Sequence, residues 1–363
     1  MNILFLSTHL NTGGITSYLL TLAKGLRRRG HRIFLATSGG NTQEEFKKIG
    51  ADLIPLNIHT KSELDPRIYL AMGPLKNLVQ ENRIDVIHAQ TRITQVMGEL
   101  LHKITKRPYI STCHGFFKKR LSRRIFPCWG NRVIAISEAV SEHLHKDFGI
   151  LEEKIVLIPN GIDLEEFPLI KDEQKQFNRQ KFHLGDNPII GIIARLSDVK
   201  GQDILIWAMK KVLEKIPQAQ LLLIGEGKEE TALRAHVKDL KLENHVHFYP
   251  IVNKTAESLS LLDVFVMPSR QEGLGLSVME AQASGLAVVA SRVGGLPSLI
   301  EHEKTGLLVS PEDIEGLADA IIRVIQDKQL AYNLGSAARA FIQKKYSADR
   351  MVGKTLEVYE TLV

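Results

Sequence analysis

The sequence predicts an α/β protein in which two doubly wound, parallel-sheet domains face a cleft. The chain has 363 residues, more than a single hydrophobic core ordinarily serves, and this length favours two domains. Apolar, β-rich runs alternate with amphipathic helical patterns in both halves. The runs are continuously hydrophobic rather than alternating with polar residues, which is typical of strands covered on both faces of a parallel sheet.

Strands are predicted at regular intervals in both halves. In the first half they span residues 2–7, 32–37, 85–89, 109–113, 132–136 and 155–158. In the second half they span residues 189–194, 220–225, 246–248, 264–267, 287–290 and 306–309. Helical patterns such as 17–28 and 202–215 supply the crossovers that a parallel sheet requires. The carboxyl ends of the strands then meet at one edge of each sheet, where such folds bind ligands.

The boundary between the domains is predicted near the middle of the chain. Residues 171–187 are rich in Lys, Gln and Asn, carry no strand pattern, and are placed in a linker at about 160–187. The first domain is therefore assigned residues 1–165 and the second domain residues 166–346. The tail, 347–363, has the pattern of a final amphipathic helix.

Composition narrows the class of protein. Hydrophobic residues make up 44% and charged residues 24%, as in an ordinary globular protein, and the net charge of +6 is too small to indicate nucleic-acid binding by itself. Cys113 and Cys128 are the only cysteines, which excludes a disulfide framework and fits a reducing compartment. The opening MNILFLSTHL has no basic region before its apolar run and is interpreted as a first strand rather than a signal peptide. No apolar run reaches the length needed to cross a bilayer.

The segment RQEGLGLSVME, residues 270–280, carries two glutamates separated by glycines and apolar residues. A buried strand is predicted to end just before it, so Glu272 lies in a loop and a helix starts near Leu276. The first turn of that helix presents unpaired backbone N–H groups that suit a phosphate, and Glu280 follows about one turn later. Carboxylates accept hydrogen bonds from paired hydroxyl groups, so a sugar nucleotide fits this arrangement. A capped helix with a surface glutamate fits it equally well.

A second group of candidates follows the strand predicted at 189–194. Arg195 stands at its carboxyl end, and Lys200 with Gly201 opens the next helix. Two cations at a strand end and a helix start can neutralise a diphosphate. The alternative is two solvated basic side chains, and it is weaker for Arg195 because that residue directly follows an apolar strand.

Two weaker signals lie in the first half. Gly13 and Gly14 follow the first strand, where glycine lets the backbone approach a ligand, although their spacing is not that of dinucleotide-binding loops. His114 follows the strand at 109–113 and can form a hydrogen bond or donate a proton near neutral pH. Turn geometry alone explains the glycines, and a structural role alone explains the histidine.

Taken together, these residues resemble the retaining glycosyltransferases of family 4 (glycosyl transferases group 1). The residues that carry the resemblance, in matching order and spacing, are Gly13, Gly14, His114, the PNGID segment 159–163, Arg195, Lys200, Glu272 and Glu280. The resemblance covers nearly the whole chain and implies the GT-B fold, which consists of two Rossmann-like domains. It places residues 1–165 on the acceptor side, assigns nucleotide-sugar binding to residues 166–346, and packs the helix 347–363 back on the first domain.

The family also implies roles for single positions. Arg195 and Lys200 hold the donor diphosphate in place of a metal ion, and Glu280 binds the ribose hydroxyls. His114 and Glu272 contact the transferring sugar and are the predicted catalytic residues. The predicted donor-binding residues are Gly14, Arg195, Lys200, Gly225, Ile251, Gly273, Leu274, Gly275, Leu276 and Glu280.

The implied reaction moves a sugar, with retention, from a nucleotide-sugar donor to a glycan or lipid-linked acceptor. A UDP-sugar is favoured as donor, and the expected pathway is the synthesis of cell-envelope polysaccharide or lipopolysaccharide. The activity is of the hexosyltransferase type (EC 2.4), and no cofactor or metal is expected. Cations and helix N–H groups stabilise the charge on the departing diphosphate. No carboxylate is placed as a nucleophile, so front-face attack assisted by the leaving phosphate is implied.

The segment 116–129, FFKKRLSRRIFPCW, mixes basic and apolar residues. Such a mixture suits an anionic membrane surface, whereas the alternative is a solvated basic face that packs on the domain. We expect the segment to edge the acceptor side, in an enzyme that is cytoplasmic and peripheral on the inner face of the membrane. The basic residues assigned to this contact are Lys118, Lys119, Arg120, Arg123 and Arg124.

Other classes of protein share these features. A GT-B epimerase uses the same donor site without an acceptor, and a degenerate GT-B protein binds glycan without chemistry. The intact set of charged donor residues argues against the second alternative. DNA glucosylation is a third, suggested by the basic balance, but the basic residues cluster in one stretch instead of lining a groove. No nucleic-acid partner is therefore expected.

Overall fold

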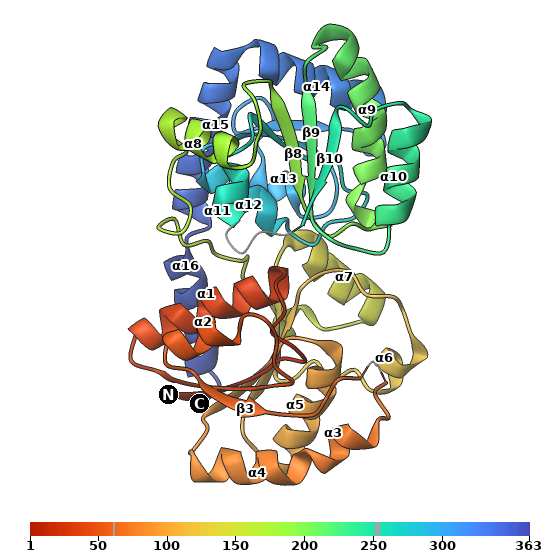
Figure 1. The fold of residues 1–363 in the computed structure, drawn as a ribbon. Coiled ribbons are helices and arrows are strands. Elements are labelled where there is room, and N and C mark those ends of the chain that lie inside the picture. Colours follow the sequence, from red (N-terminus) through yellow and green to blue (C-terminus); the bar gives the residue numbers. More distant parts are fainter. Residues whose placement is uncertain (61, 251–254) are drawn as a thin grey trace. The chain divides into compact units, whose positions relative to one another are not determined.

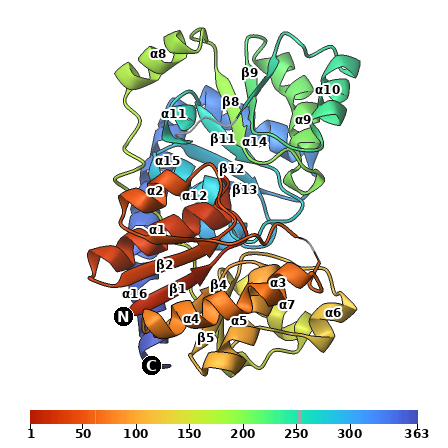
Figure 2. The same cartoon turned by 60° about the horizontal axis from the view of Figure 1, so that its bottom comes forward.

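A computed structural model, which describes residues 1–60, 62–250 and 255–363, divides the chain into two compact units. The first unit comprises Met1–Gly161 together with Ala348–Val363, and the second comprises Ile162–Ser347. Each unit is built on one parallel sheet flanked by helices (Figures 1 and 2), which confirms the predicted fold class. Among the described residues, none of the helices combines the length and the hydropathy of a transmembrane span.

The first unit has a seven-stranded sheet with the strand order β3-β2-β1-β4-β5-β6-β7. Its strands are β1 (Asn2–Leu6), β2 (Arg32–Thr37), β3 (Asp52–Pro55), β4 (Val86–Ala89), β5 (Tyr109–Cys113), β6 (Arg132–Ala135) and β7 (Ile155–Leu157). Its α-helices are α1 (Gly14–Arg28), α2 (Gln43–Lys48), α3 (Pro66–Leu70), α4 (Met72–Glu81), α5 (Arg92–Thr105), α6 (Leu121–Ile125), α7 (Glu138–Phe148) and α16 (Ala348–Glu360).

Strand β1 is continuously hydrophobic because it is buried on both of its faces. Successive side chains of a strand point to opposite faces, and Ile3 and Phe5 enter a cluster with residues of α1 and α16. Leu4 and Leu6 enter a separate cluster with residues of α4 and α5. All four side chains are fully buried, so the strand contributes to two cores at once.

The last helix, α16, completes the first unit. It lies against α1 (Figures 1 and 2), and Gly25 permits the close approach, because a Cβ there would stand 2.5 Å from Cγ2 of Val352. The hydroxyl of Tyr359 lies 2.7 Å from Nδ1 of His88, and Nε2 of the same ring lies 2.7 Å from Oγ1 of Thr112. Burial lowers the pKa of His88 to about 3, so the ring is neutral and donates from one nitrogen while accepting at the other.

The second unit has a six-stranded sheet with the strand order β10-β9-β8-β11-β12-β13. Its strands are β8 (Ile189–Ile193), β9 (Gln220–Ile224), β10 (Val246–Tyr249), β11 (Val264–Met267), β12 (Ala287–Ser291) and β13 (Leu307–Val309). Its α-helices are α8 (Asp172–Lys181), α9 (Gln202–Lys215), α10 (Glu230–Asp239), α11 (Thr255–Leu259), α12 (Leu276–Ala283), α13 (Leu296–Leu299), α14 (Ile314–Gln326) and α15 (Lys328–Lys345).

Helix α8 corrects the prediction of a linker at about 160–187. Its residues Asn178 and Arg179 are buried, and the guanidinium of Arg179 donates to the carbonyl oxygen of Leu261 and to Oδ2 of Asp263. Lys175 forms a further ion pair with Asp263. The polar composition that suggested a linker therefore belongs to a helix whose long side chains satisfy polar groups at the start of β11.

The predicted strands agree with the observed ones to within one residue at either end, and one further strand, β3, is present. β3 lies at the edge of its sheet, is only partly buried, and contains Asp52 and Pro55. Both residue types are disfavoured in strands except at such edges. The local pattern was therefore too weak to predict it.

Each sheet has one point at which the order of its strands reverses. This switch point lies between β1 and β4 in the first sheet and between β8 and β11 in the second. Open α/β sheets bind their ligands beyond the carboxyl ends of the strands at such points. In the second unit, the loops concerned are residues 194–201 after β8 and residues 268–275 after β11.

We expect Tyr359→Phe to lower the free energy of unfolding of the first unit by about 1–3 kcal/mol, because a buried nitrogen of His88 loses its partner. Trp129 lies in the first unit and Trp207 in the second. Urea unfolding followed by tryptophan fluorescence in a Trp207→Phe background therefore reports on the first unit. Tyr69→Phe, which removes a hydroxyl from an exposed tyrosine of the same unit, is the control. Equal midpoints for the two variants would contradict this role of the buried hydrogen bond.

Candidate functional site

The second unit gathers predicted donor residues at the switch point of its sheet. Arg195 and Lys200 lie in the loop after β8, and Glu272 lies in the loop after β11. Gly275 precedes α12 with φ at 105°, a left-handed conformation that a side chain disfavours. The helix therefore begins at Leu276, and its first turn leaves N–H groups without intrahelical partners.

Lys200 and Glu272 form an ion pair that joins these two loops. Nζ of Lys200 lies 2.5 Å from Oε2 of Glu272, and the two side chains are 20% and 11% exposed. The hydroxyl of Ser269 lies 3.5 Å from the same carboxylate oxygen. Because both charges are largely withdrawn from water, each compensates the other, and removal of one leaves the other unpaired.

Arg270 links the loop that carries Glu272 to helix α9 through hydrogen bonds. Its guanidinium donates to both carboxylate oxygens of Asp203, at 2.8 and 2.7 Å, and to Oε1 of Glu312 at 2.8 Å. Its backbone N–H donates to the carbonyl oxygen of Val199 at 2.9 Å. The hydrogen bonds with Asp203 raise the pKa of Arg270 above its ordinary value. Arg270 and Asp203 were not predicted as part of the site.

A third loop, which follows β12, supports the backbone of Glu272. Gly294 has φ at 53°, and a Cβ on it would stand 1.9 Å from the carbonyl oxygen of Glu272. The N–H of Gly295 donates to that oxygen at 3.0 Å, and a Cβ at Gly295 would stand 2.4 Å from the carbonyl oxygen of Gly273 and 2.7 Å from Cα of Leu274. A side chain at either position would displace the predicted donor loop. The adjacent glycines after a buried strand are the signal that sequence reasoning missed.

Glu280 is a half-buried carboxyl group on α12, about one turn after its start. Burial, and then the carboxylate of Glu166, raises the pKa of Glu280 to about 8. Within the described part of the chain, no hydrogen bond to its carboxyl group opposes this shift. Carboxylate oxygens accept hydrogen bonds from paired hydroxyl groups, so Glu280 can take hydroxyl groups of a ligand.

The remaining predicted residues of the second unit lie around the β8 loop. Arg195 is exposed, and its carbonyl oxygen accepts a hydrogen bond from Nε2 of Gln202 at 3.0 Å. Gly225 follows β9 and lies against this loop, since a Cβ there would stand 2.0 Å from the carbonyl oxygen of Ala194. Ile251, also predicted to contact the donor, lies outside the described residues.

Two of the predicted catalytic and donor-binding residues belong to the first unit. Gly14 is the first residue of α1. His114 follows β5, its Nε2 lies 2.9 Å from Oε1 of Gln90, and its ring meets that of Tyr18 edge-on at 4.8 Å between centroids. Burial lowers the pKa of His114 to about 3, so at neutral pH the ring forms hydrogen bonds as a neutral group. Gln90 was missed, although it directly follows β4, the neighbour of β5 in the sheet.

The segment 116–129 has an exposed part and a buried part. Lys118, Lys119 and Arg120 are exposed. Arg123, by contrast, is only 7% exposed, and its guanidinium lies 3.9 Å from the centroid of the Phe117 ring. Arg123, one of the residues assigned to the membrane contact, is therefore buried, unlike Lys118, Lys119 and Arg120.

The aromatic residues of the segment divide in the same way. Phe126 is 58% exposed, whereas Trp129 is 7% exposed and lies beside Phe117, in a tilted arrangement, and Phe148, edge-on. The side chain of Arg124 lies outside the described part of the structure. The segment thus has both an exposed apolar residue and an aromatic residue within a buried cluster.

Two family models match the chain. The model Glycosyltransferase Family 4 matches residues 12–166, and the model Glycosyl transferases group 1 matches residues 173–341. The chain therefore belongs to the family 4 glycosyltransferases of group 1, as the resemblance implied. It is a glycosyltransferase of EC class 2.4 that uses a nucleotide-sugar donor, so the epimerase and the non-catalytic binding protein are excluded as alternatives.

Known proteins support this placement. The chain is 29% identical to an uncharacterized glycosyltransferase of Methanocaldococcus jannaschii, over 96% of this chain and 94% of that protein. It is 27% identical to the N-acetyl-alpha-D-glucosaminyl L-malate synthase of Bacillus anthracis, over 94% and 91%. It is also 27% identical to the UDP-Gal:alpha-D-GlcNAc-diphosphoundecaprenol alpha-1,3-galactosyltransferase of Escherichia coli, over 80% and 78%. The crystal structure of Anabaena HepE with UDP-glucose covers the whole of both chains with a TM-score of 0.89 at 24% identity, which shows a shared GT-B fold.

The raised pKa of Glu280 predicts that the stability of the second unit falls as pH rises. Between the ordinary carboxyl pKa of 4.5 and about 8, the unfolded chain loses this proton while the folded chain keeps it, so ionisation favours the unfolded state. One such group contributes a slope of at most about 1.4 kcal/mol per pH unit.

Urea unfolding from pH 5 to pH 8, followed by Trp207 fluorescence in a Trp129→Phe background, measures this slope. Glu280→Gln should flatten it, and Glu243→Gln, at an exposed carboxyl of the same unit, should leave it unchanged. Parallel curves for the Glu280→Gln variant and its parent would contradict the raised pKa.

Proposed function

We propose that this glycosyltransferase transfers a hexose, with retention, from a UDP-sugar to a glycan or lipid-linked acceptor in cell-envelope synthesis. The observation that carries the donor half of the proposal is the Lys200–Glu272 ion pair at the switch point, with Arg195 in the same loop. Two cations at this edge can take up the donor diphosphate without a metal ion.

The Lys200–Glu272 pair also suggests how donor binding prepares the site. A diphosphate at Lys200 competes with Glu272 for the ammonium group and frees the carboxylate to accept hydrogen bonds from sugar hydroxyls. The bond from the anomeric carbon to the phosphate oxygen then breaks, and Arg195, Lys200 and the first N–H groups of α12 stabilise the charge on the leaving diphosphate. The acceptor hydroxyl forms the new bond on the same face and gives its proton to that phosphate.

The other predicted residues complete the proposal. Glu280 binds the ribose hydroxyls, and Gly14 and Gly225 let the backbone approach the donor. His114, held neutral and hydrogen-bonded to Gln90, contacts the transferring sugar as a hydrogen-bonding group. Ile251 is assigned to the base.

The proposed acceptor side includes contact with an anionic membrane. Lys118, Lys119 and Arg120 are exposed, and Ile125 and Phe126, a few positions later, are exposed apolar side chains. Basic residues near an anionic surface contribute about 1 kcal/mol each. The similarity to a galactosyltransferase named for a diphosphoundecaprenol acceptor supports a lipid-linked acceptor. The proposal extends to a peripheral, cytoplasmic location on the inner face of the membrane.

Glu280→Gln should weaken UDP binding by about tenfold or more, because hydrogen bonds to a charged group contribute about 1.5–3 kcal/mol. It should also abolish proton release on binding, since the free protein keeps this proton up to about pH 8 and hydroxyl groups favour the ionised form. Isothermal titration calorimetry at pH 7, in two buffers of different protonation enthalpy, measures both effects. Glu243→Gln is the control. If Glu280→Gln leaves UDP and GDP affinity unchanged, the ribose assignment fails.

Reversal of three exposed charges, Lys118→Glu, Lys119→Glu and Arg120→Glu together, should remove most binding to anionic vesicles. The electrostatic attraction that it removes is screened by salt, so raised ionic strength should weaken binding of the native chain in parallel. Co-sedimentation with phosphatidylglycerol and phosphatidylcholine vesicles is the measurement. The matched control reverses Lys48, Lys106 and Arg107, which are exposed basic residues elsewhere in the first unit. Equal, negligible binding of the native chain to both vesicles would indicate a soluble acceptor.

A further inference from the structure

The first unit contains a pocket of about 1090 Å³ beside α6. It is bounded by the end of α5, by α6 and the residues that follow it, and by the end of α7 with the turn beyond it. The charged side chains that line it are Glu99, Lys103, Lys119, Arg120, Arg123, Asp147 and Lys154. The large apolar side chains that line it are Leu121, Ile125, Phe126, Trp129, Phe148, Ile150 and Leu151.

The charges around this pocket are unbalanced. The five basic side chains exceed the two acidic ones by three, and each acid already has a partner. Glu99 lies 3.6 Å from Lys103, and Asp147 lies 2.7 Å from Lys119. The excess positive charge attracts an anion.

Arg123 is the most constrained of these cations. It is 7% exposed, its guanidinium lies over the rings of Phe117 and Trp129 at 3.9 and 5.7 Å from their centroids, and its Nη1 is buried without a hydrogen-bond partner among the described residues. Burial lowers the pKa of Arg123 to about 10. Buried arginines are ordinarily paired, and the planar guanidinium is the group best suited to phosphate.

An apolar rim adjoins these cations. Leu121, Ile125 and Phe126 are 70%, 61% and 58% exposed, and Leu151 on the opposite wall is 56% exposed. Exposed apolar side chains that line a basic pocket are unfavourable in water and typical of an interaction site. The two features together match a molecule with an anionic head and an apolar tail.

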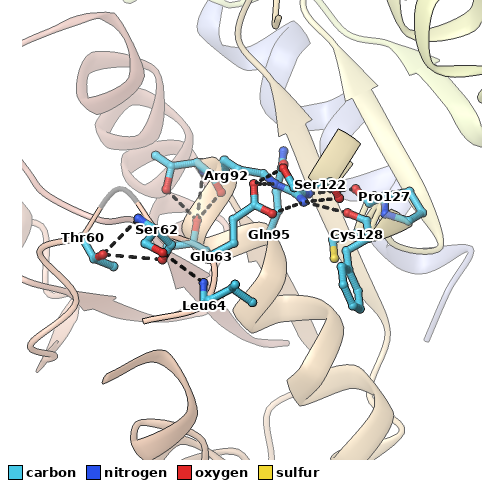
Figure 3. Close-up of polar contacts among 12 residues, drawn as sticks. Thr60, Ser62, Glu63, Leu64, Arg92, Gln95, Ser122, Pro127 and Cys128 are labelled. Atoms are coloured by element: carbon cyan, nitrogen blue, oxygen red, sulfur yellow. Dashed lines mark hydrogen bonds and ion pairs between the residues drawn. The ribbon is translucent and has the colours of Figure 1, made fainter. Parts of the chain in front are cut away.

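Hydrogen bonds hold α6 and the residues that follow it in place (Figure 3). Arg92 donates to both carboxylate oxygens of Glu63, at 2.8 and 2.9 Å, and to the carbonyl oxygens of Phe126 and Pro127, at 2.7 and 3.2 Å. Ser122 donates to Glu63 at 3.2 Å. The hydrogen bond from Arg92 lowers the pKa of Glu63. These hydrogen bonds hold this wall of the pocket in place and reduce the cost of ordering it when a ligand binds.

We propose that this pocket binds one molecule of an anionic phospholipid, with the phosphate at Arg120 and Arg123. The acyl chains lie on the exposed apolar edge of α6 and on Phe126. The site rests on the membrane contact proposed above and deepens it, because a surface attraction alone needs no pocket and no buried guanidinium. It selects an anionic headgroup by hydrogen-bond geometry as well as by charge.

Dihexanoyl phosphatidylglycerol below its micelle concentration tests the site without a bilayer and without any sugar donor. In a Trp207→Phe background, Trp129 lines the pocket and its fluorescence follows binding, while calorimetry gives the stoichiometry. We expect one lipid per chain and binding at least about tenfold weaker for Arg123→Gln. Arg107→Gln, at an exposed arginine of the same unit outside the pocket, should change affinity by less than about twofold.

Further ligands and variants distinguish the contribution of the anionic headgroup to binding from that of the acyl chains. Dihexanoyl phosphatidylcholine and glycerol 3-phosphate should each bind at least about tenfold more weakly, since one lacks net charge and the other lacks acyl chains. Arg120→Gln and Phe126→Ser, at exposed positions, should also weaken binding if Arg123→Gln proves unstable. Equal affinity for glycerol 3-phosphate, or no effect of any pocket variant, overturns the proposal.

These experiments also distinguish a failure of the lipid-binding pocket from a failure of the proposed function. Binding to anionic vesicles without binding of the monomeric lipid overturns the pocket and leaves the membrane contact standing. Lipid binding in a protein that transfers no sugar from any UDP-sugar supports the pocket and counts against the proposed reaction alone.

Discussion

Direct contact between backbones at the carboxyl edge of the second sheet determines where its charged side chains lie. A Cβ at Gly201 would stand 2.0 Å from the carbonyl oxygen of Pro268, and Gly294 approaches the carbonyl oxygen of Glu272 as closely. The loops after β8 and β12 therefore meet the β11 loop with no side chain between them. Lys200 precedes Gly201 and reaches Glu272 because the main chains are this close. The positions of the charged side chains in the donor site thus depend on close backbone packing at uncharged glycines.

Much of the fold could be predicted because parallel strands buried on both faces leave a strong local signal. Strand β1 is an example, since every residue from Ile3 to Leu6 is buried and the run is uninterrupted. The misses occur where long-range contacts outweigh local pattern. Helix α8 looks like a linker because its composition is polar, yet Arg179 is buried by contacts with residues more than eighty positions away. Edge strand β3 gave no signal because it is short, only partly buried, and begins and ends with Asp52 and Pro55.

In the candidate site, too, some features could be predicted from the neighbouring sequence, whereas others depend on contacts between distant residues. The positions of Arg195, Lys200 and Glu272 follow from the strands that precede them, so the sequence places them at one edge of the sheet. The ion pair itself could not be predicted from the sequence, because the loop geometry determines which of the two cations reaches Glu272. The burial of a side chain is equally absent from the local sequence. Nothing near Arg123 in the sequence distinguishes it from its exposed neighbour Arg120, and only the fold brings its guanidinium against the rings of residues 117 and 129.

The return of the chain to its first unit has a consequence for folding during synthesis. Val352 and Tyr359 provide fully buried side chains to the first core, but they are made after the whole of Ile162–Ser347. At about 5–20 residues per second on the ribosome, that interval lasts roughly ten to forty seconds. During this time α1 and His88 lack their covering helix, while the second unit is still being synthesised. The unit that is translated first is therefore the last to be completed, and it presents an open apolar groove to chaperones until the final helix arrives.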